Sequence, residues 1–261
     1  YGIFHDYPQK KTTFTRQKQQ KRASMQFANT HSAHWCTTFL QHVHDLTDEI
    51  ILPRRCPVCG TVMHAHEQVV CGCCLALIPY THFGSALDNI MIRTLWPQAP
   101  IERATSLFYY RPLSGSRKLI IDIKYHHCAR LAERLGEMAA KMLCREWDDA
   151  GVDAIVAVPI HWRKKMKRGY NQAERIAWGI GRAFGLPVVE GMLRRNRLGI
   201  SQTRLNEAER KANATNTYHA TVPPEWRGRH LMIVDDVCTT GATLTACAHA
   251  LLAADPTLRI S

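Results

Sequence analysis

The chain has 261 residues, 46% of them apolar, and a formal net charge of +12 at pH 7. This length suits one domain with an extension or two small domains, and the apolar share is enough to bury a core. No apolar run is long enough to cross a bilayer, which excludes a membrane-spanning helix. The positive charge favours anionic partners such as phosphates, nucleic acid or an acidic protein, although a basic protein without such a partner is an equal alternative.

The N-terminal segment is basic and polar. The first 24 residues hold six lysines or arginines and one acid, without an apolar period. We expect residues 1–33 to be a disordered or non-native extension, in which residues 1–24 could lie upstream of a start at Met25. No apolar core follows the basic start, so it does not read as a signal peptide, and we expect a cytoplasmic protein. Residues 34–52 predict a short helix with an apolar face formed by Trp35, Phe39, Val43, Leu46 and Ile50.

Residues 53–80 contain two Cys-x-x-Cys pairs. They are Cys56 with Cys59 and Cys71 with Cys74, about a dozen residues apart. Two such pairs supply the four thiolates of a tetrahedral structural zinc site, and thiolates select zinc over magnesium or calcium. Disulfides are rare in the cytoplasm, so a metal is the better reason for this many cysteines. We therefore expect a small zinc-ribbon-like module here.

Other residues in this block leave alternatives open. Cys73 could replace a ligand only in an altered pair, and His64 and His66 are weaker candidate ligands. A redox disulfide would explain one Cys-x-x-Cys pair but explains two less well. The remaining thiols are expected to be ordinary small core or surface residues: Cys36, Cys128, Cys144, Cys238 and Cys247.

After a linker over residues 81–102, strand and helix patterns alternate from residue 103 to the end. Apolar runs predict strands at 104–110, 153–159, 186–193 and 230–235. Helical patterns cover 114–146, 171–184 and 242–254. This alternation predicts an α/β fold with a mostly parallel, doubly wound sheet. A further strand would begin at the closing "LRIS", so we expect a truncated C-terminus.

The segment "IVDDVCTTGAT" places two adjacent acids after a strand and a turn of small residues before a helix. Open α/β sheets bind ligands at the carboxyl ends of their strands. The N–H groups and threonine hydroxyls of the turn can hold a phosphate, aided by the positive end of the following helix. Asp235 and Asp236 would repel that phosphate unless they bind another group. Two ribose hydroxyls fit, so a sugar 5-phosphate satisfies both demands.

Two other interpretations of this segment stay open. The turn could simply cap a helix. The acids could also resemble the Mg²⁺ pocket of a response-regulator receiver. Only 25 residues follow Asp236, however, too few for the rest of such a domain.

The same segment resembles the phosphoribosyl-pyrophosphate binding motif of type I phosphoribosyltransferases. The resemblance implies that Asp235 and Asp236 are the catalytic pair, holding the 2- and 3-hydroxyls of the ribose. It implies that the turn binds the 5-phosphate through Thr239, Thr240, Gly241, Ala242 and Thr243.

Four more stretches together resemble the ComF family of competence proteins, which has GntX-like relatives. They are "CPVCG … CGCC", "IDIKYHH", "VPIHWRKKMKRGYNQAERIA" and "RRNRLGISQTRLNEAERKAN", and the resemblance runs from about residue 50 to the end. It implies a phosphoribosyltransferase-like domain at 103–261 behind the zinc module. It also implies a cytoplasmic role in DNA uptake during natural transformation.

The resemblance places pyrophosphate and Mg²⁺ at the loop from His161 to Gly169. Its cations suit a polyanion, and the expected substrate-binding residues are Arg163, Lys164 and Arg168, with Lys165 and Lys167 beside them. Gly169 predicts a tight turn, and Asn171 predicts a cap for the following helix.

The basic segment 194–213 occupies the place of a lid over the sugar phosphate, or it is a disordered surface insert. Gly199 and the pair Thr217-Tyr218 depart from the family pattern.

Three functions remain open. We favour a DNA-uptake protein that binds phosphoribosyl pyrophosphate and Mg²⁺. An active phosphoribosyltransferase with an unknown acceptor is the second, although no general base or base-specific hood can be identified. The third is a non-catalytic module that binds single-stranded DNA or a competence helicase. Aromatic residues among the basic ones could stack bases: Trp162, Tyr170, Tyr218 and Trp178, the last in a position more typical of a core.

Overall fold

The computed structural model describes residues 53–83, 88–147, 150–195 and 217–261. The chain divides into a unit of residues 1–54 and a unit of residues 55–261, and every element described below belongs to the second. The expected N-terminal extension and the helix at 34–52 lie outside the described residues, as does the lid segment beyond Arg195.

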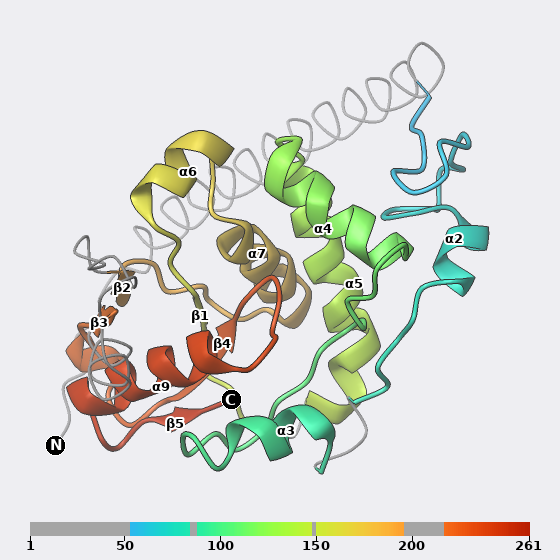
Figure 1. Ribbon diagram of the computed structural model, residues 1–261. Helices are drawn as coiled ribbons and strands as arrows, with labels where there is room; N and C mark the ends of the chain where they lie inside the picture. Colours follow the sequence, from blue (N-terminus) through green and yellow to red (C-terminus); the bar gives the residue numbers. More distant parts are fainter. Residues whose placement is uncertain (1–52, 84–87, 148–149, 196–216) are drawn as a thin grey trace, which may run out of the picture. The chain divides into compact units, whose positions relative to one another are not determined.

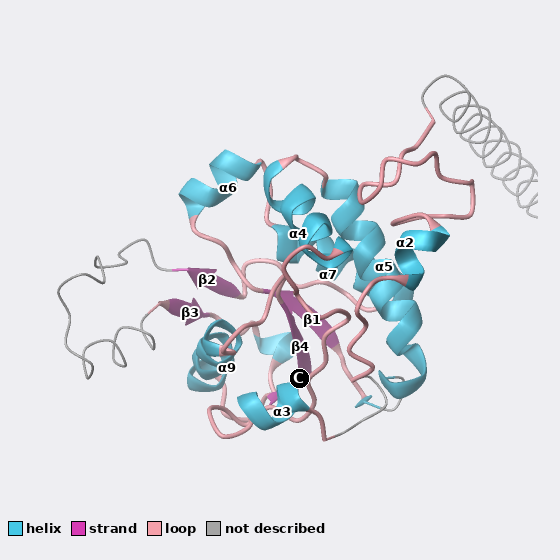
Figure 2. Cartoon of the chain, turned by 45° about the vertical axis from the view of Figure 1, so that its right-hand side comes forward, coloured by secondary structure: helices cyan, strands magenta, loops and turns pink. Residues whose placement is uncertain are grey.

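The central sheet is parallel and confirms the predicted α/β class. It consists of β1 (Ala154–Ala157), β4 (His230–Val234) and β5 (Arg259–Ile260), in the order β1-β4-β5. Within it, Ala157 is opposite Val234, so β1 and β4 end at the same level (Figure 2). The predicted strands at 153–159 and 230–235 are therefore confirmed, and β5 is the strand expected to begin in "LRIS".

Alternate residues of the strands face two separate cores. Ala154 and Val156 lie in one core with residues of α9 (Ala242–Ala254), whereas Ile155 lies in the other with residues of α7 (Gln172–Phe184). This period of two is the pattern of a strand that is buried on both faces. The helices therefore cover both faces of the sheet, as a doubly wound arrangement requires (Figure 1).

The predicted helices at 171–184 and 242–254 are α7 and α9. The Asn171 side chain accepts a hydrogen bond from the Ala173 N–H and caps α7, and Gly169 adopts the left-handed conformation with φ 77°. Both expectations for these two residues are confirmed. The stretch 114–146, which carries helical patterns, holds two helices, α4 (Gly115–Tyr125) and α5 (Ala129–Trp147), because the chain turns at His127 with φ 55°.

A two-stranded antiparallel hairpin lies beside α9. It is formed by β2 (Leu193–Arg195) and β3 (Tyr218–Ala220), with Arg195 opposite Tyr218. The segment between these strands is the predicted lid, whose residues 196–216 are not described. The hairpin thus fixes both ends of that segment.

The strands predicted at 104–110 and 186–193 are wrong, because these stretches form few backbone pairs with neighbouring strands. Residues 104–110 form one isolated bridge, Phe108 with Tyr80, and residues 186–193 form one, Val188 with Ile155. Next to β5, a strand of two residues, the contact is made by the chain before the first stretch: the Glu102 N–H donates to the Ile260 carbonyl at 2.8 Å. The second stretch turns away from β1 at Gly191, where φ is 76°.

Segments expected to be linker or loop contain short helices. The linker 81–102 carries α3 (Ile90–Leu95), which Asn89 caps and which buries Ile92 and Leu95 in the core. The expected loop at His161–Gly169 contains α6 (Trp162–Arg168). The other short helices are α2 (Gly72–Ala76) and a 3₁₀ turn at Pro224–Trp226. None of the helices in the described ranges is long and apolar enough to cross a membrane.

Candidate functional site

The carboxyl ends of β1 and β4 form one edge, where the candidate site lies. The Val158 N–H donates to the Val234 carbonyl at 2.9 Å, which holds the two chains together as they leave the sheet. The chain after β1 leads into α6, and the chain after β4 leads through the two acids into α9. The structure therefore brings the basic segment and the acidic pair to the same edge of the sheet, as the sequence predicts.

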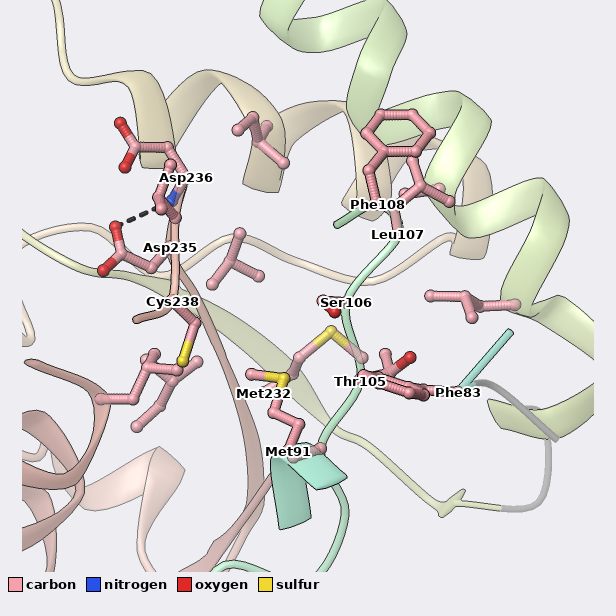
Figure 3. A pocket seen from close by; sticks show the side chains of 18 of the residues that line it. Phe83, Met91, Thr105, Ser106, Leu107, Phe108, Met232, Asp235, Asp236 and Cys238 are labelled. Carbon is pink, nitrogen blue, oxygen red and sulfur yellow. Dashed lines mark hydrogen bonds between the residues drawn. The ribbon is translucent and has the colours of Figure 1, made fainter. Parts of the chain in front are cut away.

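The two acids are fixed by different contacts. The Asp236 N–H donates to Oδ1 of Asp235 at 2.8 Å (Figure 3). The Asp236 carboxylate forms an ion pair with Lys124 of α4, whose Nζ lies 3.1 Å from Oδ1. The exposed fractions of these two side chains are only 21% for Lys124 and 13% for Asp236. The acidic pair is thus largely withdrawn from solvent and partly neutralised.

Burial changes the charge state of this pair. It raises the pKa of Asp235 to about 6, and the neighbouring charge of Asp236 acts in the same direction. Lys124 and Arg195 oppose that rise because their positive charges favour the carboxylate. Near neutral pH the pair still carries negative charge and can accept hydrogen bonds from hydroxyl groups.

The turn after the acids leaves the start of α9 without a side-chain cap. The N-cap is Gly241, with φ 78°, which has no side chain to accept a capping bond, and the Thr240 hydroxyl accepts a hydrogen bond from the Ala242 N–H at 3.5 Å. A Cβ at this position would lie 2.3 Å from Cδ2 of Leu95, so the turn requires glycine for space as well as conformation. Thr239 and Thr240 are exposed beside this helix start.

The basic helix α6 lies on the surface, with no buried residue. Arg168 donates to Oε1 of Gln172 at 2.8 Å, and its guanidinium group lies over the ring of Tyr125. The guanidinium of Arg163 lies over the ring of Trp162. Lys164 is exposed. The cations expected to bind pyrophosphate are therefore on an exposed helix that starts directly after the β1 edge.

Most of the aromatic residues proposed for base stacking are unsuited to it. Tyr170 and Tyr218 are buried, and the Tyr170 hydroxyl donates to the Ile123 carbonyl. Trp178 is half-buried, as expected for a core position, and the guanidinium of Arg175 covers its ring. Trp162 is 46% exposed, and the guanidinium of Arg163 lies over its ring. The stacking prediction is thus wrong for the two tyrosines, because packing buries their rings.

The four predicted metal ligands come together. The sulfur atoms of Cys56, Cys59, Cys71 and Cys74 all lie within 4.8 Å of one another. Cys73 is exposed and is not a member of this cluster. The four-cysteine cluster has the ligand type and spacing of a structural zinc site, so it could bind a metal such as zinc.

The environment of the cluster affects its thiols differently. Hydrogen bonds with Thr61 lower the pKa of Cys59 to about 6, whereas burial raises the pKa of Cys74. The Cys71 N–H donates to the sulfur of Cys56 at 3.4 Å, an arrangement common around metal-bound thiolates. The alternative ligands His64 and His66 are exposed and stack on each other, with ring centroids 5.7 Å apart.

A cavity of about 450 Å³ adjoins the acidic pair. Asp235 and Asp236 lie at one end of it, and Phe83 and Thr105 lie at the other (Figure 3). Most of its lining is apolar, from β4, α4, α5 and the segment 103–110. Asp235 is buried at this end of the cavity, and that burial raises its pKa.

Two residues at this edge were missed by sequence reasoning. Lys124 lies in "IDIKYHH", a stretch noted for its resemblance to ComF proteins but given no role. Arg195 lies where β2 enters the lid segment, and its guanidinium covers the ring of Tyr218. Neither residue could be assigned to the site from sequence spacing alone, because each lies far from the acids along the chain.

The fold and this edge define an α/β protein that presents an acidic pair and an uncapped helix start, joined to a four-cysteine module. No model of a known family matches the chain. It is 28% identical to DNA utilization protein YhgH of Escherichia coli (strain K12) over 200 residues, which is 76% of this chain and 77% of that protein. The YhgH protein of Salmonella typhimurium matches equally, at 28% over the same shares.

Another relative is named as a competence protein. Over 93 residues the chain is 32% identical to Competence protein F of Haemophilus influenzae, covering 35% of this chain and 41% of that protein. The chain is thus a homologue of the YhgH proteins and Competence protein F, which confirms the resemblance to ComF proteins. Among solved structures, glutamine phosphoribosylpyrophosphate amidotransferase from B. subtilis matches at 22% identity and a TM-score of 0.36. That match covers 54% of this chain and 30% of the other, and it is too loose to carry an argument.

Proposed function

We propose that this protein binds phosphoribosyl pyrophosphate with Mg²⁺ at the carboxyl edge of its sheet, and that it serves in DNA uptake. The observation that carries the proposal is the pairing of a buried, partly neutralised acidic pair with a helix start that lacks a side-chain cap. The names of its homologues, which refer to DNA utilization and competence, support the biological role. We place the protein in the cytoplasm, where incoming DNA is handled.

The acids and the turn would bind different parts of the sugar phosphate. Asp235 and Asp236 would accept hydrogen bonds from the 2- and 3-hydroxyls of the ribose. The exposed N–H groups at the start of α9 and the hydroxyls of Thr239, Thr240 and Thr243 would hold the 5-phosphate. Gly241 lets the backbone turn tightly here, and Ala242 begins the helix without a bulky side chain.

The pyrophosphate would lie toward α6. Arg163, Lys164 and Arg168 would bind its oxygens, and Mg²⁺ bound to the pyrophosphate would neutralise part of its charge. If the protein catalyses phosphoribosyl transfer, the bond from the anomeric carbon to pyrophosphate breaks while a bond to the acceptor forms. The protein contributes positioning and charge stabilisation. An active transferase with an unidentified acceptor is therefore an extension of the same site, and its residues are the same.

A second candidate function is binding of single-stranded DNA, favoured by one observation. On α6, Trp162 is exposed among Arg163, Lys164 and Lys165, which is the combination of stacking surface and positive charge that such binding uses. DNA lacks the 2-hydroxyl, so the acidic pair would not serve an internal DNA sugar. The DNA surface and the ribose site would then be adjacent but distinct. A competence helicase or DNA-processing protein is a further proposed partner, for the zinc module.

The test is a calorimetric titration of phosphoribosyl pyrophosphate and Mg²⁺ into the zinc-loaded protein. The double variant Asp235→Ala/Asp236→Ala is the comparison, with its folding checked by circular dichroism. We expect saturable binding by the wild type that is lost in the double variant. A folded wild type that shows no binding would refute the sugar-phosphate site.

A further inference from the structure

Lys124 and Asp236 are 112 positions apart in the sequence, yet they form the most enclosed contact of the candidate site. The distance from Nζ to Oδ1 is 3.1 Å, and both side chains are mostly buried. A buried ion pair of this kind is not a source of stability by default, because both charges lose water. Because this ion pair lies at the candidate ligand-binding edge, we look for its role in function rather than in stability.

The backbone that carries Lys124 is held firmly. Its neighbour Ile123 is fully buried, and the Ile123 carbonyl accepts the hydrogen bond from the buried Tyr170 hydroxyl. Two residues further on, the ring of His126 is held by Asp122 at 2.7 Å, and His127 contacts the Arg168 carbonyl. The end of α4 is therefore anchored to the core and to the end of α6.

The position of Lys124 on α4 directs it to the acids. Ile120 and Ser116 lie one and two turns earlier on the same helix face, and both line the cavity that ends at Asp235 and Asp236. Lys124 continues this row to the mouth of the cavity. Its ammonium group meets the outer acid, whereas Asp235 is oriented by the Asp236 N–H.

The geometry points to Lys124 as the positioning residue of the acidic pair. By holding the Asp236 carboxylate in one orientation, it would keep both carboxylates placed to accept hydrogen bonds from two neighbouring hydroxyls of a ribose. This inference rests on the proposed function, and it assigns Lys124 to recognition of the sugar rather than of the pyrophosphate. Without Lys124, two adjacent carboxylates would repel each other in a site with little water.

Two ligands separate this role from direct phosphate binding. Phosphoribosyl pyrophosphate carries the ribose hydroxyls, whereas inorganic pyrophosphate carries only the phosphate groups. Both are titrated with Mg²⁺ into the wild type, Lys124→Met and Lys124→Arg. Arg130→Met is the matched control, because Arg130 is an exposed cation on α5 and its loss changes the net charge equally.

We expect Lys124→Met to weaken binding of phosphoribosyl pyrophosphate about tenfold to a hundredfold, as for loss of a charged hydrogen-bond partner. Binding of pyrophosphate should stay unchanged in this variant, and Arg130→Met should bind both ligands as the wild type does. Lys124→Arg should recover most of the lost affinity, since it restores the charge. If Lys124→Met does not fold, Lys124→Gln replaces it in the same comparison.

Two results would overturn the assignment while leaving the proposed function intact. One is a Lys124→Met variant that binds phosphoribosyl pyrophosphate as tightly as the wild type. The other is an equal loss of affinity for both ligands, which would make Lys124 a direct phosphate contact. A wild type that binds pyrophosphate but gains nothing from the ribose would instead refute the proposed function itself.

Discussion

Asp236 donates its backbone N–H to the side chain of Asp235, at 2.8 Å, so the two acids are coupled through the backbone as well as through their charges. Burial nevertheless raises the pKa of Asp235 to about 6. The carboxylate form, which accepts hydrogen bonds from hydroxyls, is therefore lost when the pH falls below that value. The acidic pair thus gives ligand binding a pH dependence in the mildly acidic range.

We predict that the affinity for phosphoribosyl pyrophosphate falls about tenfold from pH 7.5 to pH 5, because at one pH unit below the pKa only about a tenth of Asp235 is ionised. Calorimetry at a series of pH values measures this. Pyrophosphate serves as the control, since its own phosphates titrate in the same range but do not meet the acids. Parallel pH profiles for the two ligands would contradict a role for Asp235 in sugar binding.

Replacing Asp235 by asparagine should stabilise the protein near neutral pH. A carboxyl group with a raised pKa in the folded state binds its proton more tightly there. Its stability contribution is therefore greatest at low pH and is lost as the pH rises through about 6. We expect Asp235→Asn to increase the free energy of unfolding by roughly 1–3 kcal/mol at pH 8 and by much less at pH 4.

Urea denaturation at the two pH values measures that difference. Asp88→Asn is the control, because the neighbouring Arg93 lowers the pKa of Asp88 and removal of its charge should bring no gain. The stabilised Asp235→Asn variant should also lose affinity for the ligand. An Asp235→Asn variant that is less stable than the wild type at pH 8 would show that Asp235 is structural.

The four-cysteine cluster should bind one zinc ion that stabilises the module around it. Cys59→Ser should reduce the bound zinc and lower the melting temperature, because the site loses one of its four thiolates. Cys73→Ser is the matched control and should retain both, since Cys73 is exposed and outside the cluster. Elemental analysis and thermal unfolding with and without a chelator measure these effects. Equal zinc content in the two variants would exclude Cys59 as a ligand.

The packing of α5 against α7 depends on two glycines. A Cβ at Gly179 would lie 2.0 Å from the Glu133 carbonyl oxygen, and a Cβ at Gly136 would lie 2.1 Å from the Ile176 carbonyl oxygen. These neighbours are backbone atoms, so the helices must move apart to admit a methyl group. We expect Gly179→Ala to destabilise the protein by roughly 3 kcal/mol, measured by urea denaturation. A neutral effect would mean that the helices are not this close in solution.

The sequence predicts best those elements that its local pattern determines. Helix α7 has a periodic apolar face, α9 is apolar over most of its length, and β1 and β4 are continuous apolar runs, so the sequence predicts their positions correctly. The spacing of the cysteines was enough to predict that their four sulfur atoms lie close together. The predicted acidic pair and turn do lie at the carboxyl edge of the sheet.

The predictions failed where a structure depends on a partner elsewhere in the chain. Residues 104–110 have the composition of a strand but lack a paired neighbour over most of their length. Helix α6 has no apolar face to reveal it, because all of its side chains lie on the surface. The contact of Lys124 with Asp236 could not be predicted, since no local pattern encodes a meeting of residues so far apart.

The central claim is that the acids recognise ribose hydroxyls while the start of α9 holds a phosphate. The most direct measurement compares the dissociation constants of ribose 5-phosphate and 2-deoxyribose 5-phosphate, which differ in one hydroxyl, for the wild-type protein. We predict that the deoxy sugar binds about tenfold more weakly, because it leaves a charged acceptor without its hydrogen bond. Equal affinity for the two sugars would contradict the assignment of Asp235 and Asp236 to the ribose.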